Sequence, residues 1–173
     1  GGSLADQTLL FLGAGEAATG IADLAVAAMI AHGIAAAAAR ARCWLVDTRG
    51  LVVRSRGDLA EHKRPYAQDH APIGDFPTAV RALRPTAIIG VAATGQTFTR
   101  EVLEEMARNN PRPIVFALSN PTSRSECTAE EAYRWTDGRA LFASGSPFDP
   151  VKIEGRTFVP RRWPAVAFLA SHP

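Results

Sequence analysis

The sequence predicts an α/β fold: a doubly wound parallel sheet of about five strands with helices on both faces. Three observations predict it. Short apolar runs alternate with helix-forming segments along the chain, and parallel strands need such helical crossovers. A glycine-containing turn joins the first apolar run to the first helix-forming segment. The 173 residues are 47% hydrophobic, which is enough for one buried core.

The first half of the chain supplies two of the predicted strands. Residues 7–12 (QTLLFL) form an apolar run typical of a buried strand. Residues 16–41 consist of strong helix formers and predict one long helix. Residues 43–47 (CWLVD) predict a second buried strand, which residues 51–53 continue after a turn. Residues 54–75 are polar and contain prolines, so we expect a loop with one or two helical turns.

The second half continues the alternation. Helices are predicted at residues 76–84, 99–108 and 128–135, and strands at residues 86–91, 113–118 and 140–143. Thr99 and Thr128 are the expected N-caps of their helices, and Glu131 completes a capping box with Thr128. Ligands bind beyond the carboxyl ends of the strands in such sheets. The residues that follow each strand are therefore the candidates for binding.

Composition and charge exclude several classes of protein. Nineteen Lys and Arg against 17 Asp and Glu give a net charge of +2, so neither nucleic acid nor an acidic membrane is the expected partner. Cys43 and Cys127 lack the spacing of a redox or metal motif, which predicts a reduced, intracellular and soluble protein. The alanine-rich residues 21–39 are interrupted by Asp23 and His32, which favours a soluble helix over a membrane span.

The turn after the first strand reads Gly13-Ala14-Gly15-Glu16-Ala17-Ala18, the G-x-G-x-x-A form of a dinucleotide-binding fingerprint. Gly13 permits the tight turn, Gly15 lets the backbone approach a pyrophosphate, and Ala18 lets helix and strand pack closely. The N–H groups and the positive end of the helix dipole favour phosphate there. The pattern predicts a Rossmann-like domain, the alternative being a simple tight turn.

Asp47 ends the second strand, where an acidic side chain binds the adenosine ribose in dinucleotide-binding domains. The alternative is that it stabilises the turn that follows, because Asp favours turn starts. Several basic residues come next: Arg49, Arg54, Arg56, Lys63 and Arg64. If two or three of them face the ribose, they favour a 2′-phosphate and hence NADP. The alternative for this stretch is a solvated loop.

Small or amide side chains follow the third and fourth strands. Ala92 begins the run AATG after the third strand, where small side chains allow a flat ring to approach. Asn120 lies in the run SNPT after the fourth strand and offers an amide donor and acceptor to a nicotinamide or a carboxylate. The alternative for Asn120 is an Asx turn before Pro121.

Other polar residues do not form a recognisable site. His62 and His70 lie near Asp58 and Asp69 in the sequence, but their spacing fits no standard metal site. We interpret them as surface residues. Cys127 has no activating base beside it and is interpreted as inert. The sequence also has no P-loop.

Five longer motifs resemble the cofactor domain of malic enzymes. In order, they are residues 11–20 (FLGAGEAATG), 44–47 (WLVD), 88–91 (IIGV), 116–122 (FALSNPT) and 142–148 (FASGSPF). Residues 95–99 (GQTFT) and 126–133 (ECTAEEAY) resemble the plant-type NADP-dependent branch. The resemblance is specific because long motifs occur in the family's order. It implies an NAD(P)-binding domain over residues 1–160 and a divergent tail over residues 161–173.

The resemblance also implies a function. Malic enzymes oxidise (S)-malate with NAD(P) and decarboxylate the product to pyruvate and CO2 with the help of Mg²⁺ or Mn²⁺. The resemblance implies that Gly13, Ala14, Gly15, Glu16 and Ala17 hold the pyrophosphate, Asp47 the adenosine ribose, and Asn120 the malate and nicotinamide region. Arg49 and Lys63 match basic positions of NADP-dependent members, which favours NADP, with NAD as the alternative. The complete enzyme is expected to be a homo-oligomer in the cytoplasm or a plastid.

Some of the family's functional residues have no match in this sequence. The general-acid Tyr, the Lys base and the metal-binding Glu and Asp residues are expected upstream of Gly1, and a start without Met is typical of a fragment or a processed form. After Pro160 the family continues with Gly-Gln-x-Asn-Asn, whereas this chain reads RRWPA. We therefore expect weak dinucleotide binding and no malate decarboxylation by this chain alone.

Two alternatives to the enzyme domain follow from this departure. The chain can be a non-catalytic dinucleotide-binding remnant, or a module from a truncated gene product. Another Rossmann dehydrogenase, such as an amino-acid dehydrogenase, is disfavoured by the motifs at residues 119–122 and 144–148.

Overall fold

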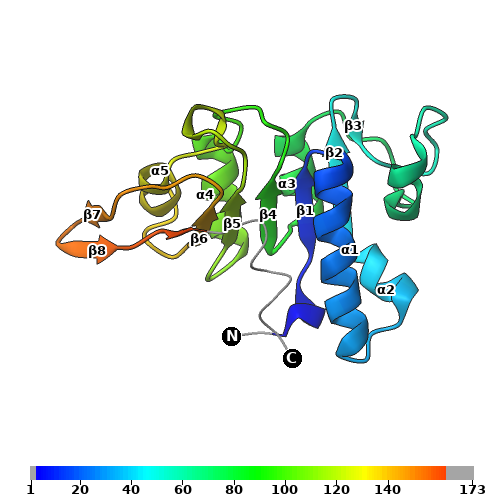
Figure 1. Cartoon of the computed structure of the whole chain (residues 1–173), viewed down its shortest axis with the longest axis horizontal. Helices are drawn as coiled ribbons and strands as arrows, with labels where there is room; N and C mark the ends of the chain where they lie inside the picture. The colour runs from blue at the N-terminus through cyan, green and yellow to red at the C-terminus, as the bar shows by residue number, and fades with distance from the viewer. Residues whose placement is uncertain (1–2, 163–173) are drawn as a thin grey trace. The chain divides into compact units, whose positions relative to one another are not determined.

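The computed structural model describes residues 3–162. Seven strands form one mixed, mostly parallel sheet in the order β3-β2-β1-β4-β5-β6-β9, and β7 and β8 form a separate two-stranded sheet. Helices pack around the large sheet (Figure 1). This arrangement confirms the predicted fold class. Two compact units divide between Ala87 and Ile88, and each is described in turn.

The first unit contains the fingerprint turn and the predicted ribose-binding residues. Its elements are η1 (Leu4–Asp6), β1 (Leu9–Leu12), α1 (Glu16–Ala31), α2 (Ala36–Ala41), β2 (Cys43–Asp47), β3 (Gly50–Leu51), η2 (Glu61–Tyr66) and α3 (Phe76–Leu83). β1 pairs parallel with β2, and β3 returns antiparallel to β2. The strand ends at Leu12 and Asp47 are therefore neighbours, so the turns that follow them lie together.

The long helix predicted over residues 16–41 is two helices, which corrects the sequence interpretation. α1 ends at Ala31, and Gly33 follows with a positive φ of 89°. The N–H of Gly33 donates to the Ile30 carbonyl and the N–H of Ile34 to the Met29 carbonyl. This is a Schellman motif, in which a left-handed glycine satisfies the last carbonyls of a helix. High alanine propensity on both sides of Gly33 concealed this C-terminus.

The second unit contains the motifs that follow the later strands. β4 (Ala87–Gly90) begins at the division. Beyond it lie α4 (Arg100–Asn109), β5 (Ile114–Ala117), η3 (Thr122–Arg124), α5 (Ala129–Arg134), β6 (Leu141–Ser144), β7 (Val151–Ile153), β8 (Arg156–Phe158) and β9 (Arg161–Arg162). β5, β6 and β9 pair in parallel. Thr99 caps α4, and Thr128 with Glu131 forms the capping box of α5, as predicted.

Strands contribute to the core of each unit, and in the second unit α4 contributes as well. Leu10, Phe11 and Leu45 are fully buried in the first unit, and Ile88 and Leu103 in the second. Strands that are buried on both faces read as continuous apolar runs, which is why β1 and β2 were predicted correctly.

The two cysteines are buried and unpaired. Burial, with the charge of Asp23 as a second cause, raises the pKa of the Cys43 thiol to about 12. Burial also raises the pKa of Cys127. Because the thiolate is the reactive form, neither residue is set up as a nucleophile.

The hairpin of β7 and β8 was not predicted, because its strands are short and half exposed. The predicted tail at residues 161–173 lies outside the described residues apart from Arg161 and Arg162, which form β9. Within residues 3–162, no helix combines the length and the apolar character that crossing a bilayer requires.

Candidate cofactor-binding site

The fingerprint turn joins β1 to α1 as the sequence predicts. Gly13 has a φ of 118°, and its N–H donates to the Val46 carbonyl at 2.8 Å, which ties the turn to the end of β2. Gly15 is the N-cap of α1, and a Cβ built there would meet nothing within 4 Å. Ala18 is 1% exposed, so helix and strand pack closely at this point. The turn thus presents backbone N–H groups at an open position.

A charged cluster surrounds Asp47 at the end of β2. Arg56 donates from both terminal nitrogens to the two Asp47 carboxylate oxygens, at 2.9 and 3.0 Å. Lys63 Nζ donates to Oδ2 at 2.6 Å, and the Arg49 N–H donates to Oδ1 at 2.9 Å. Asp58 accepts from Arg56 at 2.8 Å and from Arg49 at 3.0 Å. We call these five residues the Asp47 cluster.

The Asp47 cluster is partly shielded from water and carries a net positive charge. The Asp47 side chain is 9% exposed, Arg56 13% and Lys63 20%, whereas Arg49 is 71% exposed. Burial alone raises the pKa of Asp47, but hydrogen bonds from Arg56, Lys63 and the Arg49 backbone outweigh it and lower that pKa. The pKa of Asp58 is also lowered, chiefly by its hydrogen bond from Arg56. Three cations thus face two ionised carboxylates.

The free energy of unfolding at acid pH is expected to depend on the Asp47 cluster. Groups whose pKa is lowered on folding stabilise the folded state above their unfolded pKa, 3.8 here, and lose that contribution as the pH falls through the folded pKa. Asp47→Asn is expected to lower the free energy of unfolding by about 2 kcal/mol at neutral pH. Below pH ~4, the free energy of unfolding of Asp47→Asn should also decline less steeply with falling pH than that of the wild type. Urea unfolding across this pH range measures both effects.

Asp69→Asn is the matched control, because Asp69 is an exposed aspartate of the same loop. It should reproduce the wild-type profile. An Asp47→Asn profile parallel to that of the wild type would contradict the ionic account of the cluster.

The structure shows the turn contact of Asp47, and ribose binding by Asp47 stays a prediction. Asp47 accepts the Arg49 N–H two residues on, which is the turn-forming contact, and it is also the centre of the charged cluster. The sequence singled out Arg49 and Lys63, and the structure places both there. Arg56 provides the bidentate contact, although the sequence only placed it in a basic stretch. The sequence signal that could have pointed to Arg56 is its place as the third basic residue after Asp47.

The helical turns of η2 bring Lys63 to Asp47. η2 packs against α1, α2 and β2. Tyr66 is buried and donates from its hydroxyl to Asp23 on α1. His62 is exposed, and its Nε2 lies 3.1 Å from the Ala14 carbonyl of the fingerprint turn. The loop that the sequence described only as polar is therefore anchored beside both predicted binding elements.

A second group of predicted residues lies in the second unit, after β4 and β5. The Ala93 N–H donates to Ser119 Oγ at 3.0 Å, which joins the two segments. Asn120 is exposed, and its Oδ1 accepts from Ser146 Oγ at 2.7 Å. Ala92 is half-buried. The structure therefore brings the segments of Ala92 and Asn120 together, and it adds Ser146 as the residue that orients the Asn120 amide.

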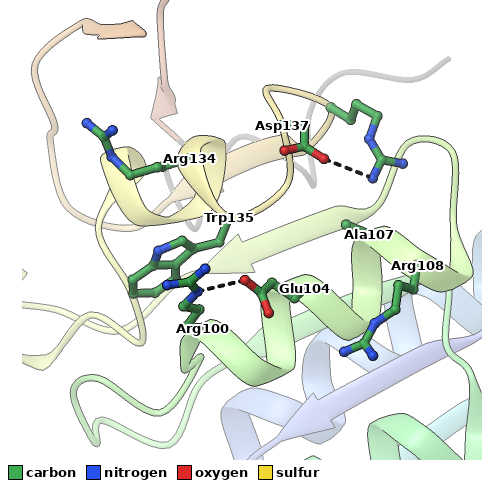
Figure 2. Close-up of a pocket in the computed structure, with 8 residues that line it drawn as sticks. Arg100, Glu104, Ala107, Arg108, Arg134, Trp135 and Asp137 are labelled. Carbon is green, nitrogen blue, oxygen red and sulfur yellow. Dashed lines mark hydrogen bonds and ion pairs between the residues drawn. The ribbon is translucent and has the colours of Figure 1, made fainter.

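A pocket of about 570 Å³ between α4 and α5 is separate from these residues (Figure 2). Its lining includes arginines, but carboxylates neutralise them: Arg100 pairs with Glu104 at 2.6 Å, and Arg139 with Asp137 at 3.6 Å. None of the predicted site residues lines it. Over the described part of the chain, no group of three or more His, Cys, Asp or Glu side chains is placed to hold a metal ion.

Comparisons with known proteins agree with the fingerprint and the strand-end motifs. The sequence profile "Malic enzyme, NAD binding domain" matches residues 1–163. The chain is 57% identical over 162 residues to the chloroplastic NADP-dependent malic enzyme of Flaveria trinervia, covering 92% of this chain and 25% of the relative. It is 55% identical over 163 residues to NADP-dependent malic enzyme 2 of Arabidopsis thaliana, covering 92% of this chain and 28% of the relative.

A third relative is the chloroplastic NADP-dependent malic enzyme of Solanum lycopersicum, 54% identical over 160 residues, which cover 91% of this chain and 28% of the relative. The chain therefore spans about a quarter of the length of the curated relatives that it matches. The family match extends from the first strand through β9. It includes the fingerprint turn, the Asp47 cluster and the segments of Ala92 and Asn120. The chain belongs to the malic enzyme family and corresponds to its NAD-binding domain.

Proposed function

We propose that this domain binds NADP and orients its nicotinamide for the oxidation of malate in an NADP-dependent malic enzyme. The names of the relatives support this cofactor and reaction. In this proposal Gly13, Ala14, Gly15, Glu16 and Ala17 hold the pyrophosphate through the backbone. Asp47, Arg49 and Lys63 hold the adenosine ribose and its 2′-phosphate. Ala92 and Asn120 receive the nicotinamide, and Asn120 also receives malate.

The fingerprint turn fits a pyrophosphate. The position of a Cβ on Gly15 is open, so the backbone can come close to a ligand there. α1 has 16 residues, and the N–H groups of its first turn carry the positive end of the helix dipole. Charge-assisted hydrogen bonds from backbone N–H groups are the contacts by which such turns bind phosphates.

The observation that carries the choice of NADP is the state of the Asp47 carboxylate. An isolated carboxylate would accept the 2′-hydroxyl of NAD and repel a 2′-phosphate. Here Arg56 and Lys63 neutralise both of its oxygens. The cluster has one cation more than it has carboxylates. A phosphate beside Arg49 and Lys63 therefore meets net positive charge.

The residues after β4 and β5 suit the nicotinamide and the malate of the proposed reaction. Because Oδ1 of Asn120 accepts from Ser146, the amide supplies its Nδ2 donors to a ligand, and these match a carboxylate such as that of malate. Ala92 has no bulk to obstruct a flat ring. NADP, when bound, accepts a hydride from its substrate, and the contribution of this chain is to bind and orient both molecules.

The rest of the proposed reaction depends on residues that this sequence does not match. The family's acid, base and metal ligands have no counterpart among residues 1–173. The described residues also offer no cluster for a divalent cation. Two of the relatives are named as chloroplastic, and this supports a plastid as the compartment of the complete enzyme.

Calorimetric titration with NADP and with NAD tests the proposal. Lys63→Ala removes a phosphate partner and leaves Asp47 less neutralised. Arg49→Ala removes the exposed cation of the cluster. Each variant is expected to weaken NADP binding by roughly 1–3 kcal/mol, the scale of a charged hydrogen bond, and to leave NAD binding nearly unchanged.

Arg64→Ala is the matched control, because it removes an equal charge next to Lys63 from a residue outside the Asp47 cluster. It should leave both affinities nearly unchanged. Equal losses for NADP and NAD in the Lys63 and Arg49 variants would overturn the assignment of the 2′-phosphate. A wild-type chain that binds neither dinucleotide would overturn the proposed function itself.

A further inference from the structure

Glu126 is a fully buried carboxyl group to which the proposed function gives no role. It lies between η3 and α5, and its exposed fraction is 0%. Removing a carboxyl group from water is costly, and an apolar side chain of similar volume is often as stable or more stable in such a place. Burial raises the pKa of Glu126 above its usual value, despite hydrogen bonds from Ser119, Ala92 and its own backbone that act in the opposite direction. A fully buried, hydrogen-bonded carboxyl group at this position points to a task beyond filling space.

The Glu126 carboxyl group joins the two segments assigned to the nicotinamide. Oε1 accepts from Ser119 Oγ, and Oε2 lies 3.4 Å from the Ser119 N–H that points to it. Ser119 Oγ in turn accepts the Ala93 N–H at 3.0 Å. One buried side chain therefore fixes the backbone directly after β4 and directly after β5.

Both neighbouring segments are shaped around this contact. Gly90, the last residue of β4, lies so close that a Cβ there would be 2.3 Å from Glu126 Cγ and Cδ. Ala93 has a φ of 53°, a left-handed conformation that costs a non-glycine residue roughly 1–2 kcal/mol. Such a conformation persists only when surrounding contacts hold it, and the hydroxyl that holds it is the one bound to Glu126.

The backbone of Glu126 extends the same link. The Phe98 N–H donates to the Glu126 carbonyl at 2.9 Å, and the Gln96 N–H donates to the Ser125 carbonyl at 3.1 Å. The segment from β4 to α4 is thus attached along its length to the segment that follows Asn120. The two segments are therefore joined by the backbone of residues 125 and 126 as well as by the Glu126 side chain.

We propose that Glu126 is a positioning residue that sets Ala92 and Asn120 for the nicotinamide half of the cofactor without touching it. The inference rests on the proposed function, because that proposal assigns the nicotinamide to these two segments. It extends the set of functional residues to a buried carboxyl group that acts through Ser119 and the Ala92–Ala93 backbone.

Glu126→Gln is the sharpest test, because the amide has the shape of the acid. Gln offers one oxygen acceptor, whereas the Ser119 hydroxyl and the Ser119 N–H donate to two different carboxylate oxygens of Glu126. A side chain that only fills space would be rescued by Gln. A residue that acts by accepting hydrogen bonds would not.

The experiment compares two ligands on the whole 173-residue chain. NADPH, followed by the fluorescence of its dihydronicotinamide, reports on both halves of the site, and 2′,5′-ADP reports only on the adenosine half. In Glu126→Gln we expect NADPH to bind at least about tenfold more weakly than in the wild type and 2′,5′-ADP to bind within about twofold. Glu130→Gln, the same change at an exposed glutamate of α5, should alter neither affinity.

Ser119→Ala provides a second variant, should the Gln protein fail to fold. It removes the hydroxyl that carries the link from Glu126 to Ala93 and leaves the carboxyl group in place. The same selective loss of NADPH affinity is expected. Unchanged NADPH affinity, or equal losses for NADPH and 2′,5′-ADP, would overturn the positioning role. Failure of the wild type to bind either ligand would instead overturn the proposed function.

Discussion

Replacing Gly15 by alanine is expected to weaken dinucleotide binding at least about 100-fold while the domain stays folded. The structure leaves open the position that the new Cβ would occupy, with nothing within 4 Å. The methyl group therefore does not clash with the protein. It takes the space through which a pyrophosphate approaches the backbone, and the loss of two charged hydrogen bonds, at about 1.5–3 kcal/mol each, exceeds a factor of 100 in the dissociation constant.

Two measurements on the same protein check this result. Calorimetric titration with NADP gives the affinity, and urea unfolding gives the stability. The change in the free energy of unfolding should stay below about 1 kcal/mol, because Gly15 is an N-cap where alanine is moderately unfavourable. A Gly15→Ala chain that binds NADP like the wild type would show that the turn does not hold the diphosphate.

Gly20→Ala is the control for this prediction. Gly20 lies within α1, also with open space around a built Cβ. In a helix interior alanine is favoured over glycine by about 0.5–1 kcal/mol. The variant should therefore be more stable than the wild type and bind NADP normally, which separates the effect of a methyl group at the turn from that of one further along the helix.

The sequence predicts the elements whose signals are local. β1 and β2 are continuous apolar runs, and their observed ends lie within two residues of the predicted ones. The caps at Thr99 and Thr128 depend on side chains next to the helix in the chain, and both form as predicted. The Gly33 break was missed because helix propensity on both sides outweighed the signal of one glycine. Local propensity cannot register a C-cap contact that only the folded backbone makes.

The candidate site was predictable to a similar degree and for a similar reason. The fingerprint turn and Asp47 follow strands, so their positions could be inferred from the order of the elements. The bidentate contact of Arg56 with Asp47 requires the chain to turn back at β3, and the single contact of Lys63 with Asp47 requires η2 to pack on β2. Glu126 gave no sequence signal beyond its place in a family motif. Its role depends on which two segments converge on it, and this information is tertiary.

Gly50→Ala is expected to cause the largest loss of stability in the first unit. Gly50 begins β3, directly after the turn that leaves Asp47, and its φ is 102°. A Cβ there would lie 2.2 Å from the Ile73 carbonyl oxygen and 3.0 Å from the Gly74 Cα, both of which are backbone atoms. A left-handed φ costs an alanine about 1–2 kcal/mol, and overpacking adds about 1–3 kcal/mol. The free energy of unfolding should therefore fall by about 2–5 kcal/mol in urea unfolding.

The same substitution should also weaken NADP binding, because the loss of stability and the loss of affinity have the same structural cause. Gly50 pairs with Asp47 in the antiparallel turn, and the Gly50 carbonyl lies 3.4 Å from the Arg56 nitrogen that holds Asp47. Moving this backbone away from Ile73 displaces the partners of the carboxylate. Gly57→Ala, in the loop that follows β3 and with open space around its built Cβ, should change stability by less than about 1 kcal/mol. If Gly50→Ala instead unfolds like the wild type, β3 is not held against residues 73–74, and the geometry derived for the Asp47 cluster fails with it.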